Sequence, residues 1–352
     1  MNATIPIQNI YYLLCYAWDV LDRKDLVDIE KENFQNLSDL FAKILIAGTT
    51  HLFKKGMDQG YRRFEEETGR LRGKIMIGPS LRSGLLRQAR AICAYDELTH
   101  NVLHNQILKT TLRRLLRSSD LALSLRQDIE LLLKRFPQVD EIPLQTRHFN
   151  QIQLTRNNKY YIFLLAICRI VHEQWLATET TGPLRFQDFL RDEDRMRRLF
   201  EAFVRNFYKK EAADFLVSAE GIRWQVHTEG PDDQYLPAMR TDVSLVHRTQ
   251  KKKIVVETKF KQDVLQHFWN VEKVHSDNLY QLFAYLKNLE SRGGVDSNCQ
   301  GVLLYAATDQ HPDFYFSLPN HHVHVTALNL NQNWRLIERD LMALLVSPSE
   351  RV

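Results

Sequence analysis

The segment from Arg240 to Phe260 constrains the fold of this chain more than any other part of its sequence. It reads RTDVSLVHRTQKKKIVVETKF, the pattern of two β-strands joined by a polar, lysine-rich turn. Ile254, Val255 and Val256 form a continuous apolar run, which is typical of a strand buried on both faces. The sequence therefore predicts a domain built around a sheet with this strand at its centre.

Charged residues follow the apolar run directly. Glu257 and Lys259 are two residues apart on the strand, so their side chains project from the same face, and Asp242 begins the preceding strand. Buried charges carry a desolvation cost unless they are paired or serve a site. An E-x-K sequence on a strand also arises by chance, so ordinary surface ion pairing is the alternative to a functional site.

A metal site would account for these residue types together. The carboxylates of Asp242 and Glu257 can converge on Mg²⁺, with Mn²⁺ as a substitute, and the backbone carbonyl of Thr258 and water can complete the ligands. Such a metal lowers the pKa of an attacking water and stabilises charge on a phosphate, while Lys259 would orient that water. The segment thus indicates metal-dependent hydrolysis of a phosphodiester.

Two helices outside the strands carry further candidates. NLYQLFAYL places Gln281 and Tyr285 at positions i and i+4 on one helix face, and RRLFEAFVRNFYKKE places Glu201 beside an apolar stripe. A helix acid, a strand acid, E-x-K and Q-x-x-x-Y occur in the order found in PD-(D/E)XK nucleases. The candidate catalytic residues are therefore Asp242, Glu257, Lys259, Gln281, Glu201 and Tyr285.

The hydrophobic pattern changes at ETTGPL (179–184), where Gly-Pro breaks a helix among polar residues. Before this linker the sequence predicts helices over 8–22, from Ser38 onward, over 101–133 and over 159–176, and a strand over 70–78. After it we expect helices at 195–211, 276–290 and 334–346, and strands near 213–228, 240–248, 252–260, 300–306 and 313–326. This order favours the α/β class (α+β overall), with domains at 1–180 and 184–352 and a mixed central sheet in the second.

Charge and hydropathy exclude some functions. The net charge of +4 is too small to identify a nucleic-acid binder, but residues 61–120 hold 12 basic and 6 acidic side chains. This excess favours contact with phosphates or an acidic partner, and a merely solvated face is the alternative. The longest apolar run, from Tyr160 to Cys168, is too short to cross a membrane, and the N-terminus lacks a secretion signal. We expect a cytoplasmic protein without a membrane partner.

Other motifs are absent or incomplete. The four cysteines contain no C-x-x-C pair, which favours reduced, buried thiols. HHVH (His321, His322 and His324) has no nearby cysteine or acid to complete a zinc site. The sequence contains no G-x-x-x-x-G-K-[ST] loop, so we expect this chain to bind no nucleotide through a P-loop.

Longer segments carry a family resemblance. The chain resembles the McrC family, nuclease subunits of McrBC-type modification-dependent restriction systems, in PIQNIYYLLCYAW, LRGKI, YDELTHNVLHNQILK, LPAMRTDVSL, IVVETKF and HSDNLYQLFAYL. These segments run from residue 6 to about 286. The resemblance implies that the family's metal-binding aspartate is Asp242, its second acid Glu257, its lysine Lys259 and its downstream glutamine Gln281. The position of Glu201 is not uniformly acidic among relatives.

The resemblance also implies a partner. In such systems a separate AAA+ hexamer, McrB, binds and hydrolyses GTP, recognises modified cytosine and translocates double-stranded DNA. The chain would dock on this hexamer through its N-terminal domain, stimulate the GTPase and cut methylated foreign DNA with its C-terminal PD-(D/E)XK endonuclease domain. The basic block at 61–120 and the predicted strand at 70–78 are the expected contact with the partner.

Two alternatives to this function remain. The chain could be a catalytically inactive adaptor that only activates the AAA+ partner, and the intact Asp242, Glu257 and Lys259 argue against that. It could also be a stand-alone PD-(D/E)XK nuclease, and the long N-terminal half argues against that.

Overall fold

The computed structural model describes residues 5–18, 34, 36–154, 159–178, 192–226, 230–261, 264–268, 271–308 and 312–346. The chain divides into two compact units. We call Met1–Leu37 together with Phe186–Val352 the sheet unit, and Ser38–Arg185 the helical unit. The predicted linker ETTGPL lies outside the described residues.

A six-stranded mixed sheet forms the centre of the sheet unit, in the order β12-β13-β11-β8-β7-β4. Its strands are β4 (Phe215–Ser218), β7 (Val243–His247), β8 (Lys253–Phe260), β11 (Gln300–Ala307), β12 (Asp313–Leu318) and β13 (His321–Asn329). β8, β11 and β13 are parallel neighbours, whereas β4, β7 and β12 run antiparallel to the strands beside them. The predicted α/β (α+β overall) class with a mixed central sheet is confirmed.

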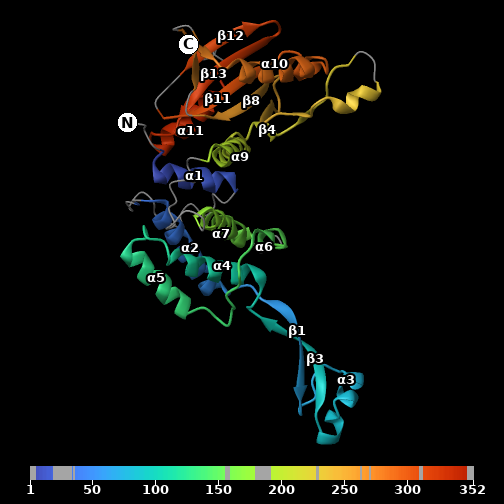
Figure 1. Cartoon of the computed structure of the whole chain (residues 1–352). Helices are drawn as coiled ribbons and strands as arrows, with labels where there is room; N and C mark the ends of the chain where they lie inside the picture. The colour runs from blue at the N-terminus through green and yellow to red at the C-terminus, as the bar shows by residue number, and fades with distance from the viewer. Residues whose placement is uncertain are drawn as a thin grey trace. The chain divides into compact units, whose positions relative to one another are not determined.

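Helices cover both faces of this sheet (Figure 1). They are α9 (Glu193–Glu211), α10 (Ser276–Glu290) and α11 (Trp334–Ala343), and a further helix, α1 (Ile7–Ala17), packs on α9. On one face, Val255 of β8 and Leu303 of β11 share a hydrophobic core with Leu282 of α10. On the other face, Phe200 of α9 meets Phe260 of β8. β8 is central because its alternate apolar residues are buried by a helix on each side.

Short elements complete the sheet unit. They are β5 (Gly221–Ile222), η4 (Pro231–Tyr235), β6 (Met239–Arg240), β9 (Leu265–Phe268), β10 (Val271–Val274) and η5 (Gly294–Asp296). β5 pairs with β6 and β9 pairs with β10, both antiparallel. The pairing of β5 with β6 brings the chain back to the sheet immediately before Asp242.

The first helix of the chain, α1, belongs to the sheet unit, which differs from the predicted division into 1–180 and 184–352. Tyr16 of α1 packs against Phe203 and Phe207 of α9, with ring centroids 5.8 and 5.3 Å apart. These contacts join segments almost 200 residues apart, and no local sequence pattern records them. The domain boundary is therefore corrected: residues 1–37 group with the C-terminal unit.

The helical unit contains a helical part and a three-stranded sheet. Its elements are α2 (Leu37–Lys55), β1 (Gly60–Thr68), β2 (Lys74–Ile75), α3 (Ile77–Arg82), η2 (Leu85–Gln88), β3 (Ala91–Thr99), α4 (Leu103–Leu115), α5 (Leu123–Lys134), α6 (Thr146–Asn150) and α7 (Lys159–Thr178). β1 and β3 form a long antiparallel ladder that leads away from the helices and ends beside α3 (Figure 1). We call residues 60–99 the arm.

Three predicted strands are wrong in extent, and the first of them, near 213–228, is the two short strands β4 and β5. Within 70–78 only Lys74–Ile75 forms a strand, because Gly73, at φ +64°, turns the chain sharply beside Ala94 and Tyr95. Region 313–326 is two strands rather than one, since a turn with Asn320 at φ +65° reverses the chain. Among the described residues, no helix is both long and apolar enough to cross a membrane.

Candidate active site

Asp242 immediately precedes β7, and Thr258 of β8 fixes its carboxylate. The backbone N–H and the hydroxyl of Thr258 both donate to Asp242 Oδ2, at 2.8 and 2.7 Å. Thr258 is buried and both bonds are partly buried, so their donors are fixed in place. The sequence suggested Thr258 for its carbonyl, whereas its N–H and hydroxyl orient the acid. The carbonyl's role as a metal ligand stays a prediction.

A chain of hydrogen bonds connects the other candidates from β8 and α10. Lys259 Nζ lies 2.8 Å from Glu257 Oε1 and 2.8 Å from Gln281 Oε1. The amide of Gln281 in turn donates to the hydroxyl of Tyr285, at 2.8 Å. Lys259 is thereby held between an acid of its own strand and an amide of the covering helix. The structure brings these four predicted residues together with Asp242.

The sixth candidate, Glu201, approaches from α9 and is paired with a residue that sequence reasoning missed. Arg205 Nη1 donates to Glu201 Oε1 at 2.7 Å and to the backbone oxygen of Asp242 at 3.0 Å. Arg205 therefore links the helix to the start of β7. Its position four residues after Glu201 on a helix was the available sequence signal, since such pairs attract.

Burial and neighbouring acids destabilise the charged forms of both Asp242 and Glu257. Burial and the neighbouring Asp242 carboxylate raise the pKa of Glu257 to about 7, although Lys259 acts in the opposite direction. Burial also raises the pKa of Asp242, against the hydrogen bonds from Thr258. A second positive charge between these acids would relieve this repulsion.

The donor set fits a hard divalent cation. Glu257 Oε2 is buried and has no hydrogen-bond partner within the described part of the chain, which leaves one carboxylate oxygen available for a ligand. Mg²⁺ prefers oxygen donors, commonly one or two carboxylates with several waters. No group of three or more His, Cys, Asp or Glu side chains that could hold a metal occurs among the described residues. A cation here would thus depend on two carboxylates plus backbone oxygen and water.

The raised pKa of Glu257 predicts a stability change. The folded chain binds the Glu257 proton more tightly than the unfolded chain, so metal-free stability falls as pH rises from about 4.5 to about 7. Glu257→Gln removes this ionisation and should stabilise the metal-free chain by about 2–3 kcal/mol at pH ~8, with a small gain at pH ~5. Urea unfolding at both pH values measures it, with the exposed Glu130→Gln as control. Equal effects at both pH values would contradict the prediction.

The histidines of HHVH have structural contacts. His321 Nδ1 lies 2.9 Å from the backbone oxygen of Cys299. His324 is buried, lies 2.5 Å from Asp313 Oδ1 and stacks on Tyr315. Both histidines therefore help to hold β13 to its surroundings.

The fold and site define an α+β protein whose central strand ends in a cluster of two carboxylates and a lysine. The chain belongs to the family described as McrBC 5-methylcytosine restriction system component, whose model matches residues 7–306. This confirms the family resemblance that the sequence motifs indicated. The chain is therefore a component of a restriction system of this family.

Two relatives illustrate the similarity. The chain is 27% identical, over 97% of each sequence, to the Type IV methyl-directed restriction enzyme EcoKMcrBC of Escherichia coli (strain K12). Its fold is similar to a structure described as a half-complex from a tetradecameric assembly of Thermococcus gammatolerans McrB AAA+ hexamers with bound McrC. The TM-score between the two structures is 0.58 and their sequence identity is 15%, and the match covers 97% of this chain and 76% of the chain in that assembly.

Proposed function

We propose that this chain is the Mg²⁺-dependent endodeoxyribonuclease subunit of its restriction system, with an active site of the PD-(D/E)XK type. One observation carries the proposal: Asp242, Glu257 and Lys259 meet at one end of β8, with a buried carboxylate oxygen left unpartnered among the described residues. Surface ion pairing is the alternative that the sequence left open, and it would not require an acid as deeply buried as Glu257, which is 2% exposed.

The residues divide the chemistry between them. Asp242 and Glu257 would hold Mg²⁺, or Mn²⁺ in its place, with Thr258 offering its carbonyl. When bound, the metal supplies Lewis-acid stabilisation of the phosphate and lowers the pKa of water. Lys259 can hold the attacking water by a hydrogen bond, and its charge offsets the negative charge that develops on the phosphate.

The remaining candidates position this centre. Gln281 accepts a hydrogen bond from Lys259 and donates one to Tyr285, so the two α10 residues fix the direction of the ammonium group. Glu201 and Arg205 hold α9 against the backbone of Asp242. Glu201 could also contact a metal through water, but its carboxylate is already paired with Arg205.

The relatives support the proposed substrate and partner. A methyl-directed relative that aligns over 97% of both sequences supports double-stranded DNA with methylated cytosine as substrate. A neighbour in fold that is bound to McrB AAA+ hexamers supports an AAA+ partner that carries the GTP. Since the sequence contains no P-loop, this chain alone should hydrolyse little nucleotide while speeding hydrolysis by the partner.

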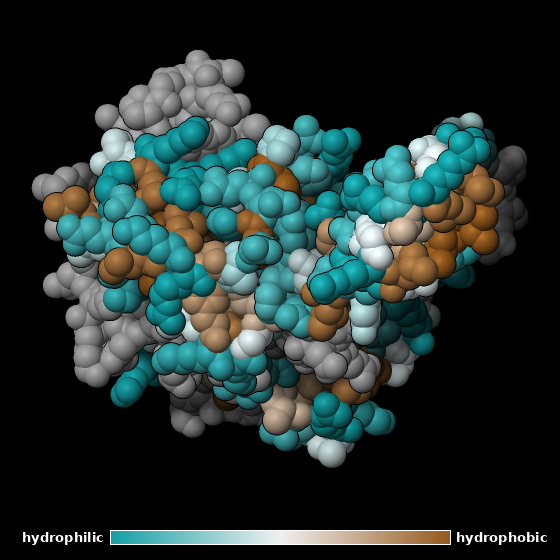
Figure 2. Space-filling model, turned by 90° about the horizontal axis from the view of Figure 1, so that it is seen from below, coloured by the Kyte–Doolittle hydropathy of each residue, from teal (hydrophilic) through white to brown (hydrophobic). Residues whose placement is uncertain are grey.

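The arm is the proposed contact with that partner. It exposes apolar side chains at Leu71, Ile77 and Leu81 together with the cationic Lys74. Figure 2 shows hydrophobic residues gathered in patches among hydrophilic ones on one face of the molecule. Exposed apolar surface rimmed by charge is typical of a protein interface.

Charge reversal on the arm should weaken partner binding. Lys74→Glu is expected to reduce association about fivefold at low salt and less at high salt, because it repels an acidic partner surface. Arg72 is a poorer choice, since it pairs with Glu66 at 2.7 Å and covers the ring of Tyr95. Lys134→Glu, at the exposed end of α5, is the control. Equal binding by both variants in a pull-down would remove the arm from the interface.

One assay separates the proposal from its two alternatives. Plasmid DNA carrying methylated cytosine is incubated with the chain and Mg²⁺, with and without the AAA+ partner and GTP. Cleavage only with the partner supports the proposed subunit. Cleavage by the chain alone at the same rate supports a stand-alone nuclease, and stimulated GTP hydrolysis without cleavage supports an inactive adaptor.

A further inference from the structure

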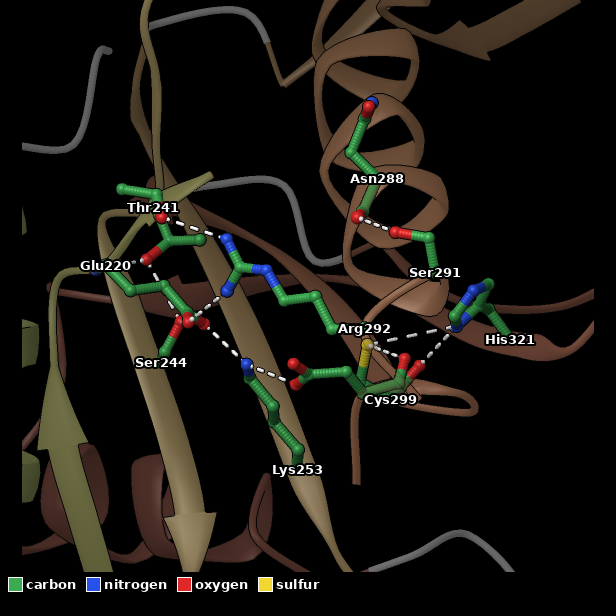
Figure 3. Close-up of polar contacts among 11 residues, drawn as sticks. Glu220, Thr241, Ser244, Lys253, Asn288, Ser291, Arg292, Cys299 and His321 are labelled. Carbon is green, nitrogen blue, oxygen red and sulfur yellow. Dashed lines mark hydrogen bonds and ion pairs between the residues drawn. The ribbon is translucent and has the colours of Figure 1, made fainter. Parts of the chain in front are cut away.

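A buried polar network lies next to the candidate active site and has no part in the chemistry proposed above (Figure 3). Its centre is Lys253, whose side chain is 3% exposed and whose Nζ lies 2.6 Å from both Glu220 Oε1 and Asp296 Oδ1. The sequence predicted a lysine-rich turn that leads into a strand at 252–260, and Lys253 is the buried first residue of that strand, β8. Burying such a charge is costly, so its two acidic partners require an explanation.

Glu220 connects this ion pair to the start of β7. Besides Lys253, its carboxylate accepts a hydrogen bond from the Ser244 hydroxyl at 2.8 Å, and Arg292 Nη1 lies 3.2 Å from its other oxygen. Burial alone would raise the pKa of Glu220, but the hydrogen bonds from Lys253 and Ser244 lower it below its usual value. Glu220 is therefore a charged acceptor, held in place from three directions.

The charge of Glu220 sets the direction of the hydrogen bonds that follow. The Ser244 hydroxyl donates its proton to Glu220. The Ser244 oxygen therefore accepts a hydrogen bond from the hydroxyl of Thr241, which lies 3.0 Å away. Thr241 is also tied to Glu220 through the main chain: its N–H donates to the Glu220 carbonyl at 3.0 Å, and its Oγ1 accepts from the Glu220 N–H at 3.1 Å. Thr241 and Ser244 are each 1% exposed, so their two hydroxyl groups are shielded from solvent.

Thr241 directly precedes Asp242. Ser244 is two residues after Asp242, so the side chains of Ser244 and Asp242 project to the same side of the extended chain. The network therefore holds the backbone on the N-terminal side of Asp242, while Arg205 holds the Asp242 carbonyl on the other side. We propose that Thr241 and Ser244 are positioning residues that, anchored by Glu220 and Lys253, keep the Asp242 carboxylate turned toward β8 and Glu257. This inference rests on the proposed function only in assigning Asp242 to a metal site.

The first test needs no metal and no DNA. The Thr258 N–H donates to Asp242 Oδ2, so hydrogen–deuterium exchange at that amide reports where the carboxylate lies. In the full-length chain, Thr241→Val and Ser244→Ala should speed exchange at Thr258 about tenfold, as expected for the loss of about one hydrogen bond. Thr241→Ser, which keeps the hydroxyl, should stay within about twofold of wild type.

A matched control removes a similar bond elsewhere. Ser291→Ala loses a hydrogen bond to the backbone oxygen of Asn288 but does not touch Thr241 or Glu220 (Figure 3). It should leave exchange at Thr258 unchanged. Two results would overturn the positioning role. In the first, Thr241→Val and Ser244→Ala speed exchange equally at all β7 and β8 amides. In the second, both variants leave the Thr258 amide as protected as Ser291→Ala does.

A second readout reaches the metal site. Titration calorimetry with Mn²⁺ should show affinity weakened about tenfold in Thr241→Val and Ser244→Ala, with Thr241→Ser within about twofold of wild type. Unaltered Mn²⁺ affinity in both variants would overturn the inference. If the wild-type chain binds no Mn²⁺, the proposed function fails, and exchange at Thr258 still decides whether the network positions Asp242.

Discussion

Alanine at Asp242, Glu257 or Lys259 is expected to reduce cleavage of methylated plasmid DNA by about a thousandfold or more in the presence of the partner and GTP. Asp242 and Glu257 supply the only two side-chain carboxylates proposed as metal ligands. Without Lys259 the developing phosphate charge loses the cationic side chain that is proposed to offset it. The measurement is initial rate under saturating Mg²⁺, with stimulation of GTP hydrolysis recorded in the same samples.

The controls separate catalysis from folding. Lys251→Ala changes a lysine in the turn before β8, and Asp232→Ala changes an exposed acid before Asp242, so both should cut at the wild-type rate. Glu257→Gln gives a sharper comparison because it should lose cleavage while gaining stability near pH 8. Unfolding cannot explain such a pair of results. Cleavage retained by Asp242→Ala would remove the acid from the active site.

Local sequence patterns predicted the elements whose stability is local. α10 was expected at 276–290 and is Ser276–Glu290, because its apolar residues repeat at helical spacing on the face that meets the sheet. β8 was expected at 252–260 and is Lys253–Phe260, because its apolar run requires burial on both faces. Since Glu257 and Lys259 lie on this strand and Gln281 and Tyr285 on that helix, four candidate residues were located correctly with the elements.

What the sequence did not reveal depends on contacts between distant segments. Arg205 contacts the backbone oxygen of Asp242, and Lys253 contacts Asp296, each across about 40 residues. A lysine in the run Lys251–Lys253 has the same local pattern whether it is exposed or buried. Only the pairing of β7 with β8, and the arrival of η5 beside them, decides which lysine is buried. The same reason accounts for α1, whose partner helix begins at Glu193.

The chain from residue 184 to 352 alone is expected to fail as a stable unit, although the sequence predicted these residues as a domain. Its missing part is α1. Tyr12 stacks on Trp334 of α11 with ring centroids 4.6 Å apart, and Asn9 Nδ2 donates to the backbone oxygens of Leu330 and Gln332, both at 2.8 Å. Each buried aromatic side chain contributes about 1.5–3 kcal/mol, so losing several would consume much of a typical stability of about 5–15 kcal/mol.

The decisive experiment compares three samples: residues 184–352, the same fragment with residues 1–37 supplied as a separate chain, and residues 38–185. The first should aggregate or melt at least about 10 °C below the sheet unit of the full chain. The second should regain cooperative unfolding, since α1 covers Phe203, Phe207 and Trp334. The third should fold, because residues 38–185 form a compact unit with a separate core. If the arm is the docking surface, this fragment should also stimulate the partner without cutting DNA.

Cooperative unfolding of 184–352 at the full-chain temperature, with no binding of residues 1–37, would show that α1 is dispensable to the sheet unit. It would also restore the boundary first suggested by ETTGPL.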